Sequence, residues 1–382
     1  MNKSHILVTI ILVAILTSAL LGCGNKDNKN KLTQGAEAQV QDINTEGANE
    51  DNSSGQNNGQ VGGNEQESQA LEQAGVAGMD GTTTSDGTTT SGDTSTFADK
   101  ALSNYDKRVL CWGTSLTYGT GGEGVTMPGV LGRLSGANVM NYGGYAENTN
   151  CIATRSGASK LTLTEGFTIP SDTNPVPVEF ETEFGDIDLI LVYTDAGLNP
   201  VTIDGIKGKL SIDDELNHYF SRFEPGEEKK IEAGTQIIPY SVEDMQPDDI
   251  QVIWTAGNDK LKNTEDIKHL IEKIDKMIEF SGSDKYIIVS EMNLHEEVPV
   301  TDEVNRMFEE YYKEHFVHLR RYFMEDAFAD LSMYPSEDDK VDIENGEIPR
   351  YFRIDEVHGN SLYYLIAGQQ VYKKCQELGY LE

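Results

Sequence analysis

Four polar residues of this 382-residue chain have side chains suited to acyl transfer. Such a site needs a hydroxyl nucleophile, a base with a near-neutral pKa, a carboxylate that orients the base and donors for the oxyanion. Ser115 follows the apolar segment Val109–Trp112 and supplies a hydroxyl, while Asn258 supplies an amide donor. Asp355 and His358 supply the carboxylate and the base. The set predicts Ser115 as nucleophile, His358 as base, Asp355 as its orienting partner and Asn258 as an oxyanion donor.

The spacing of these residues supports the prediction, although each one also has a simpler interpretation. Asp355 and His358 are three residues apart just before an expected helix, so one turn of backbone could hold the carboxylate against one imidazole nitrogen. The other nitrogen would then face Ser115. Taken alone, Gly-Thr-Ser after a strand and Gly-Asn-Asp are both typical of turns, and Asp355 could be a helix cap. The combination in a sensible topological order favours a catalytic site.

The elements that must position these residues alternate along the chain. Apolar runs predict strands at 109–112, 138–142, 250–254, 286–290 and 316–319, and apolar periodicity predicts helices at 127–134, 146–155, 264–281, 301–315, 323–331 and 361–378. Thr264 is the expected cap of the third helix. Alternating strands and helices are typical of an α/β fold with a parallel, doubly wound sheet, which binds ligands at the carboxyl ends of its strands. Ser115 would lie at such an end.

Residues 160–245 interrupt this alternation. They alternate apolar and polar residues with Pro, Gly and Asp breaks, which predicts a β-rich insertion such as a small sandwich. The expected strands are 176–184, 189–193, 201–203, 209–212, 219–223, 230–231 and 236–238. The acidic runs at 213–215, 224–228 and 337–339 are interpreted as solvated loops.

The first hundred residues predict export rather than a fold. Residues 1–22 combine Lys3 with a short apolar run that ends in Leu-Gly before Cys23, which resembles the signal peptide and lipidation site of a bacterial lipoprotein. An ordinary signal peptide or a short anchor helix is the alternative. Residues 23–100 comprise the expected lipidated Cys23 and a low-complexity tether, which as flexible coil would span on the order of 50 Å. The folded domain is expected at 101–382, outside the cytoplasm and anchored to the cell membrane.

Charge and cysteine content narrow the possible partners. The formal net charge of -34 argues against nucleic acid and against anionic membrane surfaces, leaving membrane contact to the lipid anchor. The number and spacing of the other cysteines indicate neither a disulfide framework nor a zinc site with histidine. We therefore expect Cys111, Cys151 and Cys375 to be small buried hydrophobic residues.

Four short blocks of the chain resemble those of the SGNH hydrolases, also called GDSL esterases. The family's Gly-Asp-Ser-Leu block resembles 113–116, and its Asn-x-Gly block with the following turn resembles 141–149. The Gly-x-Asn-Asp block resembles 256–259, and the closing Asp-x-x-His block resembles 355–358. The resemblance covers 107–160 and 247–380, about two-thirds of the mature chain, and leaves out the insertion.

This resemblance implies a flavodoxin-like three-layer α/β/α fold and ester hydrolysis without a metal or other cofactor. It carries over Ser115, His358 and Asp355 as a catalytic triad, with Asn258 and the backbone amides of Ser115 and Ala146 as oxyanion donors. Gly144 is the fallback donor if the loop is registered differently. Two positions depart from the family: Thr114 replaces its Asp, and Ala146 replaces a Gly. Ala146 would cost on the order of 1 kcal/mol if its φ were positive.

The chain is thus expected to be an extracytoplasmic serine esterase. Esters of short acyl groups, such as acetyl on a glycan, are the expected substrates, and lipid or generic acyl esters are the first alternative. A catalytically weak binding protein that uses its insertion is the second. Tyr118 and Tyr145 flank the expected site and are candidates for lining it.

Overall fold

The computed structural model describes residues 104–382 apart from 186, 188–189 and 293–297. The predicted signal peptide, lipidation site and tether therefore lie outside the described residues. No helix among those residues has both the length and the apolar character needed to cross a membrane.

A five-stranded parallel sheet organises the α/β part. Its strands are β1 (Arg108–Gly113), β2 (Asn138–Gly143), β12 (Ile250–Trp254), β13 (Tyr286–Val289) and β14 (Phe316–Val317). Their order across the sheet is β14-β13-β12-β1-β2, and every neighbouring pair is parallel. The chain moves outward in one direction from β1 and then in the other, so the doubly wound, flavodoxin-like order is confirmed.

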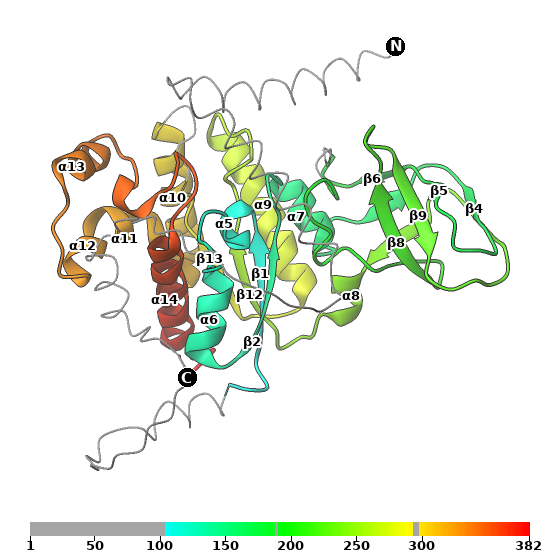
Figure 1. Cartoon of the computed structure of the whole chain (residues 1–382), viewed down its shortest axis with the longest axis horizontal. Coiled ribbons are helices and arrows are strands. Elements are labelled where there is room, and N and C mark those ends of the chain that lie inside the picture. The colour runs from blue at the N-terminus through cyan, green and yellow to red at the C-terminus, as the bar shows by residue number, and fades with distance from the viewer. Residues whose placement is uncertain (1–103, 186, 188–189, 293–297) are drawn as a thin grey trace, which may run out of the picture. The chain divides into compact units, whose positions relative to one another are not determined.

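Helices cover both faces of this sheet because alternate strand residues point to opposite sides. On one face, Val109, Cys111, Val252 and Trp254 pack with α6 (Met127–Ser135) and α14 (Ser361–Glu377). On the other, Leu110, Trp112 and Ile253 pack with α7 (Thr149–Arg155), α9 (Thr264–Ser281) and α10 (Val298–Tyr312). Figure 1 shows α6 beside α14 and α7 beside α9. The result is the expected three-layer arrangement.

Short helices complete this part. They are α5 (Ser115–Tyr118), α8 (Tyr240–Asp244), η1 (Lys313–His315), α11 (Leu319–Glu325), α12 (Ala327–Asp330), α13 (Glu337–Glu344) and η2 (Arg350–Phe352). The prediction of a loop at 337–339 was wrong, because Ser336 and Asp339 form a reciprocal capping box that starts α13. The expected helix 323–331 is instead the pair α11 and α12.

The insertion is β-rich, as predicted. Its strands are β3 (Leu161–Leu163), β4 (Phe167–Ile169), β5 (Val176–Pro177), β6 (Phe180–Thr182), β7 (Val201–Ile203), β8 (Ile206–Ile212), β9 (His218–Arg222), β10 (Lys229–Ile231) and β11 (Gln236–Pro239). Seven of them form an antiparallel sheet in the order β5-β9-β8-β7-β11-β3-β6, and β10 pairs with β4. Ile169 and Ile231 from the smaller ladder join the same buried core as Leu210 and Phe220.

Three further predictions about local structure were wrong. Residues 176–184 are not one strand, because β5 and β6 occupy opposite edges of the seven-stranded sheet. Residues 190–193 form a turn and a bend. Asn263, not Thr264, caps α9, since its side chain accepts from the amides of Glu265 and Asp266. The prediction that all three described cysteines are buried hydrophobic residues is confirmed.

Candidate active site

Ser115 lies where β1 ends and α5 begins. A Cβ at Gly113 would come within 2.3 Å of the Trp254 carbonyl oxygen, so only glycine allows β1 and β12 to approach each other there. Thr114 then caps α5 by accepting a 3.4 Å hydrogen bond from the amide of Leu116. Threonine thus fills the capping role that an aspartate could take. The turn presents Ser115 as the first residue of α5.

The structure brings Ser115, His358 and Asp355 into one chain of hydrogen bonds. The Oγ atom of Ser115 lies 3.0 Å from Nε2 of His358, across 243 residues of sequence. Nδ1 of the same ring lies 2.9 Å from Oδ2 of Asp355. This is the geometry of a nucleophile, a base and an orienting carboxylate.

A tight loop before α14 holds the last two of these residues. The amide of Ile354 donates to the carbonyl of His358 over 2.9 Å, and Arg353 and Gly359 form an antiparallel bridge. Oδ1 of Asp355 accepts from the backbone amides of Val357 at 2.7 Å and His358 at 2.6 Å. The carboxylate is therefore fixed by its own loop as well as by the imidazole.

These contacts determine which proton goes where. Burial raises the pKa of Asp355, but the hydrogen bonds from the His358 ring and from the two amides outweigh it and hold the pKa at about 2. An ionised carboxylate only accepts hydrogen bonds, so Nδ1 of His358 must carry the proton that it shares with Asp355. In the neutral ring, Nε2 is then an acceptor for the Ser115 hydroxyl.

The candidate oxyanion donors come from three segments. Within the part of the chain that the structure describes, the backbone amides of Ser115 and Ala146 have no hydrogen-bond acceptor. The φ of Ala146 is 58°, so this residue has the positive φ for which a strain cost was expected from the sequence. The amide of Gly144 already donates to the carbonyl of Gly113 over 2.8 Å, which extends the β1–β2 ladder. Gly144 is thereby excluded as the fallback donor.

The side chain of Asn258 is oriented by the same loop. Its Nδ2 atom donates to the carbonyl oxygen of Glu147 over 2.9 Å. A primary amide has two N–H donors, so one remains for a ligand. Next to it, Asp259 accepts from the amide of Thr149 at 3.1 Å and from its hydroxyl at 2.6 Å, which ties the start of α7 to the end of β12. Burial raises the pKa of Asp259, and these two bonds oppose the rise.

A buried ion pair that the sequence did not reveal supports this loop. Oε2 of Glu147 lies 2.7 Å from Nη2 and 2.8 Å from Nε of Arg155, and both side chains are almost completely buried. Arg155 also donates to the carbonyl of Tyr142 at the end of β2 and to that of Ala196 in the insertion. The pair therefore connects the proposed oxyanion loop with the sheet and the insertion. A charged residue at each end of the segment 147–155 was the only sequence signal.

One aromatic side chain lies against the imidazole, and a second lies against the first. The ring of Tyr145 stacks on that of His358 with centroids 6.0 Å apart and planes 19° apart. Tyr193, from the turn that was predicted to be a strand, meets Tyr145 edge to face at 5.3 Å. Tyr118 is exposed and contacts Asn141 through its carbonyl oxygen, and its lining role stays a prediction.

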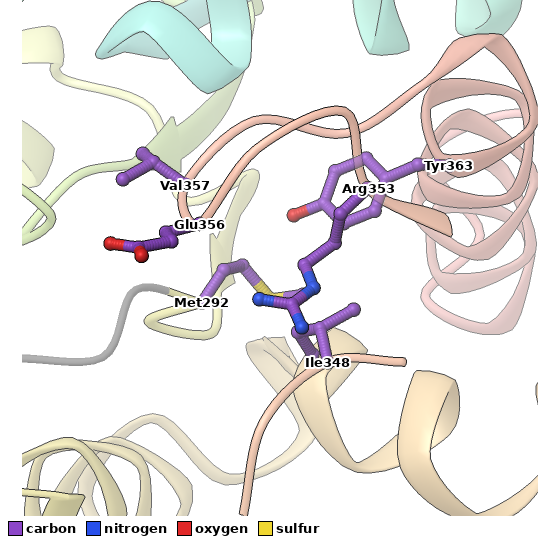
Figure 2. A pocket seen from close by; sticks show the side chains of 6 residues that line it. All are labelled: Met292, Ile348, Arg353, Glu356, Val357 and Tyr363. Atoms are coloured by element: carbon purple, nitrogen blue, oxygen red, sulfur yellow. The ribbon is translucent and has the colours of Figure 1, made fainter. Parts of the chain in front are cut away.

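A small pocket lies behind the loop that carries the histidine. Its lining residues are Met292, Ile348, Arg353, Glu356, Val357 and Tyr363. Figure 2 shows Glu356 and Val357 on one side of it and Tyr363 with Ile348 on the other. Glu356 and Val357, which separate Asp355 from His358 in the sequence, thus line this pocket. The described residues include no cluster of three or more His, Cys, Asp or Glu side chains able to hold a metal ion.

Comparisons with solved structures find similarities at low sequence identity. The chain is similar to a G-D-S-L family lipolytic protein, described as putative, from Desulfitobacterium hafniense DCB-2 (13% identity, TM-score 0.37, 70% of this chain and 99% of that one). It is also similar to a member of that family from Veillonella parvula DSM 2008 (13%, 0.34, 71% and 97%) and to a peptidoglycan O-acetylesterase (14%, 0.31, 74% and 95%). No family model matches the sequence, and neither does any curated protein.

Proposed function

We propose that this protein is a serine esterase that hydrolyses short acyl esters, with acetylated glycans as its substrates. The observation that carries the proposal is the continuous contact from Ser115 Oγ to His358 Nε2, at 3.0 Å, and from His358 Nδ1 to Asp355, at 2.9 Å. Neither hydroxyl nor imidazole needs to move for the proton transfer that activates the nucleophile.

The reaction proceeds in two halves. Ser115 Oγ attacks the ester carbonyl while its proton passes to His358 Nε2, and the carbonyl oxygen becomes an oxyanion. The amides of Ser115 and Ala146 and the side chain of Asn258 donate to that oxygen. The intermediate collapses, the C–O bond to the alcohol breaks, and the alcohol takes the proton from Nε2. Water then attacks the acyl-serine while His358 Nε2 accepts its proton. The bond between the acyl carbon and Ser115 Oγ breaks, the carboxylic acid leaves, and Nε2 returns the proton to Ser115.

Asp355 acts through the imidazole in both halves. Its ionised carboxylate keeps the proton on Nδ1 and stabilises the imidazolium that forms when Nε2 is protonated. The hydrogen bonds that fix the Asp355 carboxylate come from two backbone amides and from the His358 ring. None of these three donors is a Lys or Arg side chain. The negative charge is thus available to the imidazolium.

The proposal includes an extracytoplasmic location. Cleavage before Cys23 and lipidation of that residue would anchor the chain to the cell membrane, and residues 23–100 would act as a tether for the folded part. Replacing Cys23 with Ser should abolish the incorporation of radioactive palmitate into the chain in a bacterial host. Equal labelling of the variant and the wild type would contradict the lipid anchor.

The purified chain and its Ser115→Ala variant test the enzyme reading directly. We expect hydrolysis of p-nitrophenyl acetate by the wild type and a loss of about a thousandfold or more in kcat for the variant. A second variant, His358→Ala, tests the proposed base, and His315→Ala is its matched control. His315 stacks on Tyr286, away from the triad, so the control should keep full activity. Equal rates for wild type and Ser115→Ala would favour the binding protein instead.

A further inference from the structure

Two exposed tyrosines stand beside the proposed base, and the reaction described above uses neither. The side chain of Tyr145 is 39% exposed and that of Tyr193 is 53% exposed. Tyr145 directly precedes the proposed oxyanion donor Ala146 and stacks on His358, and Tyr193 meets it at an interplanar angle of 65°. Their two rings form a corner that opens to solvent at the edge of the triad.

The segment that carries Tyr193 is anchored on both sides, which argues against a loosely placed surface residue. Ile190 is buried in the core of the insertion, and so is Leu198. Arg155 binds the carbonyl of Ala196, and a Cβ at Gly197 would lie 2.9 Å from the Trp112 ring, so the segment rests directly on the α/β part. The insertion thus delivers one aromatic side chain to the site in a fixed position.

The chemistry of the leaving group decides which part of a substrate meets this corner. The departing alcohol must take its proton from Nε2 of His358, so the alcohol leaves on the imidazole side of the ester. Tyr145 stacks on that same imidazole. The two tyrosines therefore face the alcohol portion of the ester and lie away from its acyl group.

The shape and polarity of the corner favour a saturated, hydroxylated ring. Aromatic faces pack against the C–H face of such a ring, and the phenol groups can bond its hydroxyls. An acyl chain would need an enclosed apolar channel, whereas both rings here are open to solvent. Burial and the nearby Asp355 carboxylate raise the pKa of Tyr145. The carboxylate also places a negative charge beside the corner, which disfavours anionic alcohols.

We infer that Tyr145 and Tyr193 form a binding subsite for the pyranose ring of a neutral acylated glycan, and that Tyr193 determines selectivity for the leaving alcohol. This inference rests on the proposed esterase function. It gives the insertion a role that the triad alone does not require.

Two substrates with the same acyl group test it: an acetylated xylo-oligosaccharide and vinyl acetate. They share the deacylation step and differ only in the alcohol. For Tyr193→Ala in the full chain, the ratio of kcat/KM for the oligosaccharide to that for vinyl acetate should fall about tenfold, the loss of one good stacking contact. Tyr193→Phe keeps the ring and should restore most of the ratio. Phe223→Ala removes an equally exposed aromatic of the insertion and should leave it unchanged.

The outcomes separate this inference from the proposed function. A wild type that cleaves vinyl acetate but not the oligosaccharide would overturn the glycan subsite while leaving the esterase intact. So would an unchanged ratio in Tyr193→Ala, or an equal fall in Phe223→Ala. If wild type and Ser115→Ala are equally inactive on both substrates, the proposed function itself fails. Melting temperatures of all variants show whether a loss of folded protein is the cause of a change in activity.

Discussion

The side-chain amide of Asn258 donates to the backbone carbonyl of Glu147 over a distance of 2.9 Å. This bond joins the end of β12 to the loop after β2 and sets the orientation of the amide. The nitrogen must face Glu147, because an amide oxygen there would repel the carbonyl. The second N–H of Asn258 is thus held in a defined direction before any substrate binds, and such preorganisation is what an oxyanion donor needs.

Replacing Asn258 should therefore affect turnover much more than folding. For Asn258→Ala we expect kcat on p-nitrophenyl acetate to fall about 100- to 1000-fold, as when one oxyanion donor is removed. Asn258→Asp has nearly the same shape but cannot donate, so its kcat should fall as well. Unchanged kcat in both variants, with melting temperatures close to wild type, would exclude Asn258 from the oxyanion hole.

Replacing only one partner of the Glu147–Arg155 ion pair should strongly lower the free energy of unfolding. Burial raises the pKa of Glu147, and Arg155 opposes the rise, so the carboxylate depends on its partner. Arg155→Met leaves that carboxylate buried and unpaired, and we expect a loss of about 3–5 kcal/mol in the free energy of unfolding, measured with urea.

A double-variant cycle separates this effect from lost packing. Glu147→Gln combined with Arg155→Met removes both charges and should recover part of the loss. The exposed pair between Lys340 and Glu337 serves as control, and Lys340→Ala should change stability little. A double variant no more stable than Arg155→Met alone would contradict the ion-pair explanation.

The sequence predicted the α/β part well because its signals are local. The strand 250–254 and the helix 264–281 have the bounds expected from the mostly apolar segment Ile-Gln-Val-Ile-Trp and from helical periodicity. Asp355 and His358 were placed together because they lie only three positions apart in one loop. Their approach to Ser115 followed from the parallel sheet, which brings the ends of distant strands to one edge.

What the sequence did not reveal depends on contacts between distant segments. Tyr193 looked like part of a strand because its neighbours are apolar, but Ile190 turns into the insertion core instead. Arg155 looked like an ordinary helix-end residue, although three segments supply its partners. The helix α13 was missed because its acidic residues resemble a solvated loop, while Asp339 and Asp342 are in fact buried against the chain around Arg350.

The positive φ of Ala146 leads to a prediction about stability. At 58° its Cβ is strained, and glycine would remove that strain. Ala146→Gly should raise the free energy of unfolding by up to about 1 kcal/mol, net of the greater freedom of glycine in the unfolded chain. It should retain activity because the backbone amide remains. Ala153→Gly within the helix α7 is the control and should destabilise the fold by about 1 kcal/mol from helix propensity, and further through the loss of a buried methyl group. A loss of stability in Ala146→Gly would contradict the strain.

The depressed pKa of Asp355 gives a pH dependence with a definite sign. The carboxyl titrates at about 2 in the folded chain and near its ordinary value of 3.8 when unfolded. Its ionisation therefore stabilises the folded state above pH 3.8, and this contribution is lost as the pH falls toward 2. Asp355→Asn keeps an oxygen for the amides of Val357 and His358 but removes the charge. The stability difference between wild type and variant, measured with urea at pH 7, 4 and 2.5, should shrink as the pH falls, whereas a constant difference would place the carboxyl outside this titration.

At pH 7 the Asp355→Asn variant should lose about 10⁴-fold in kcat, because its side-chain amide no longer fixes the proton on Nδ1 of His358.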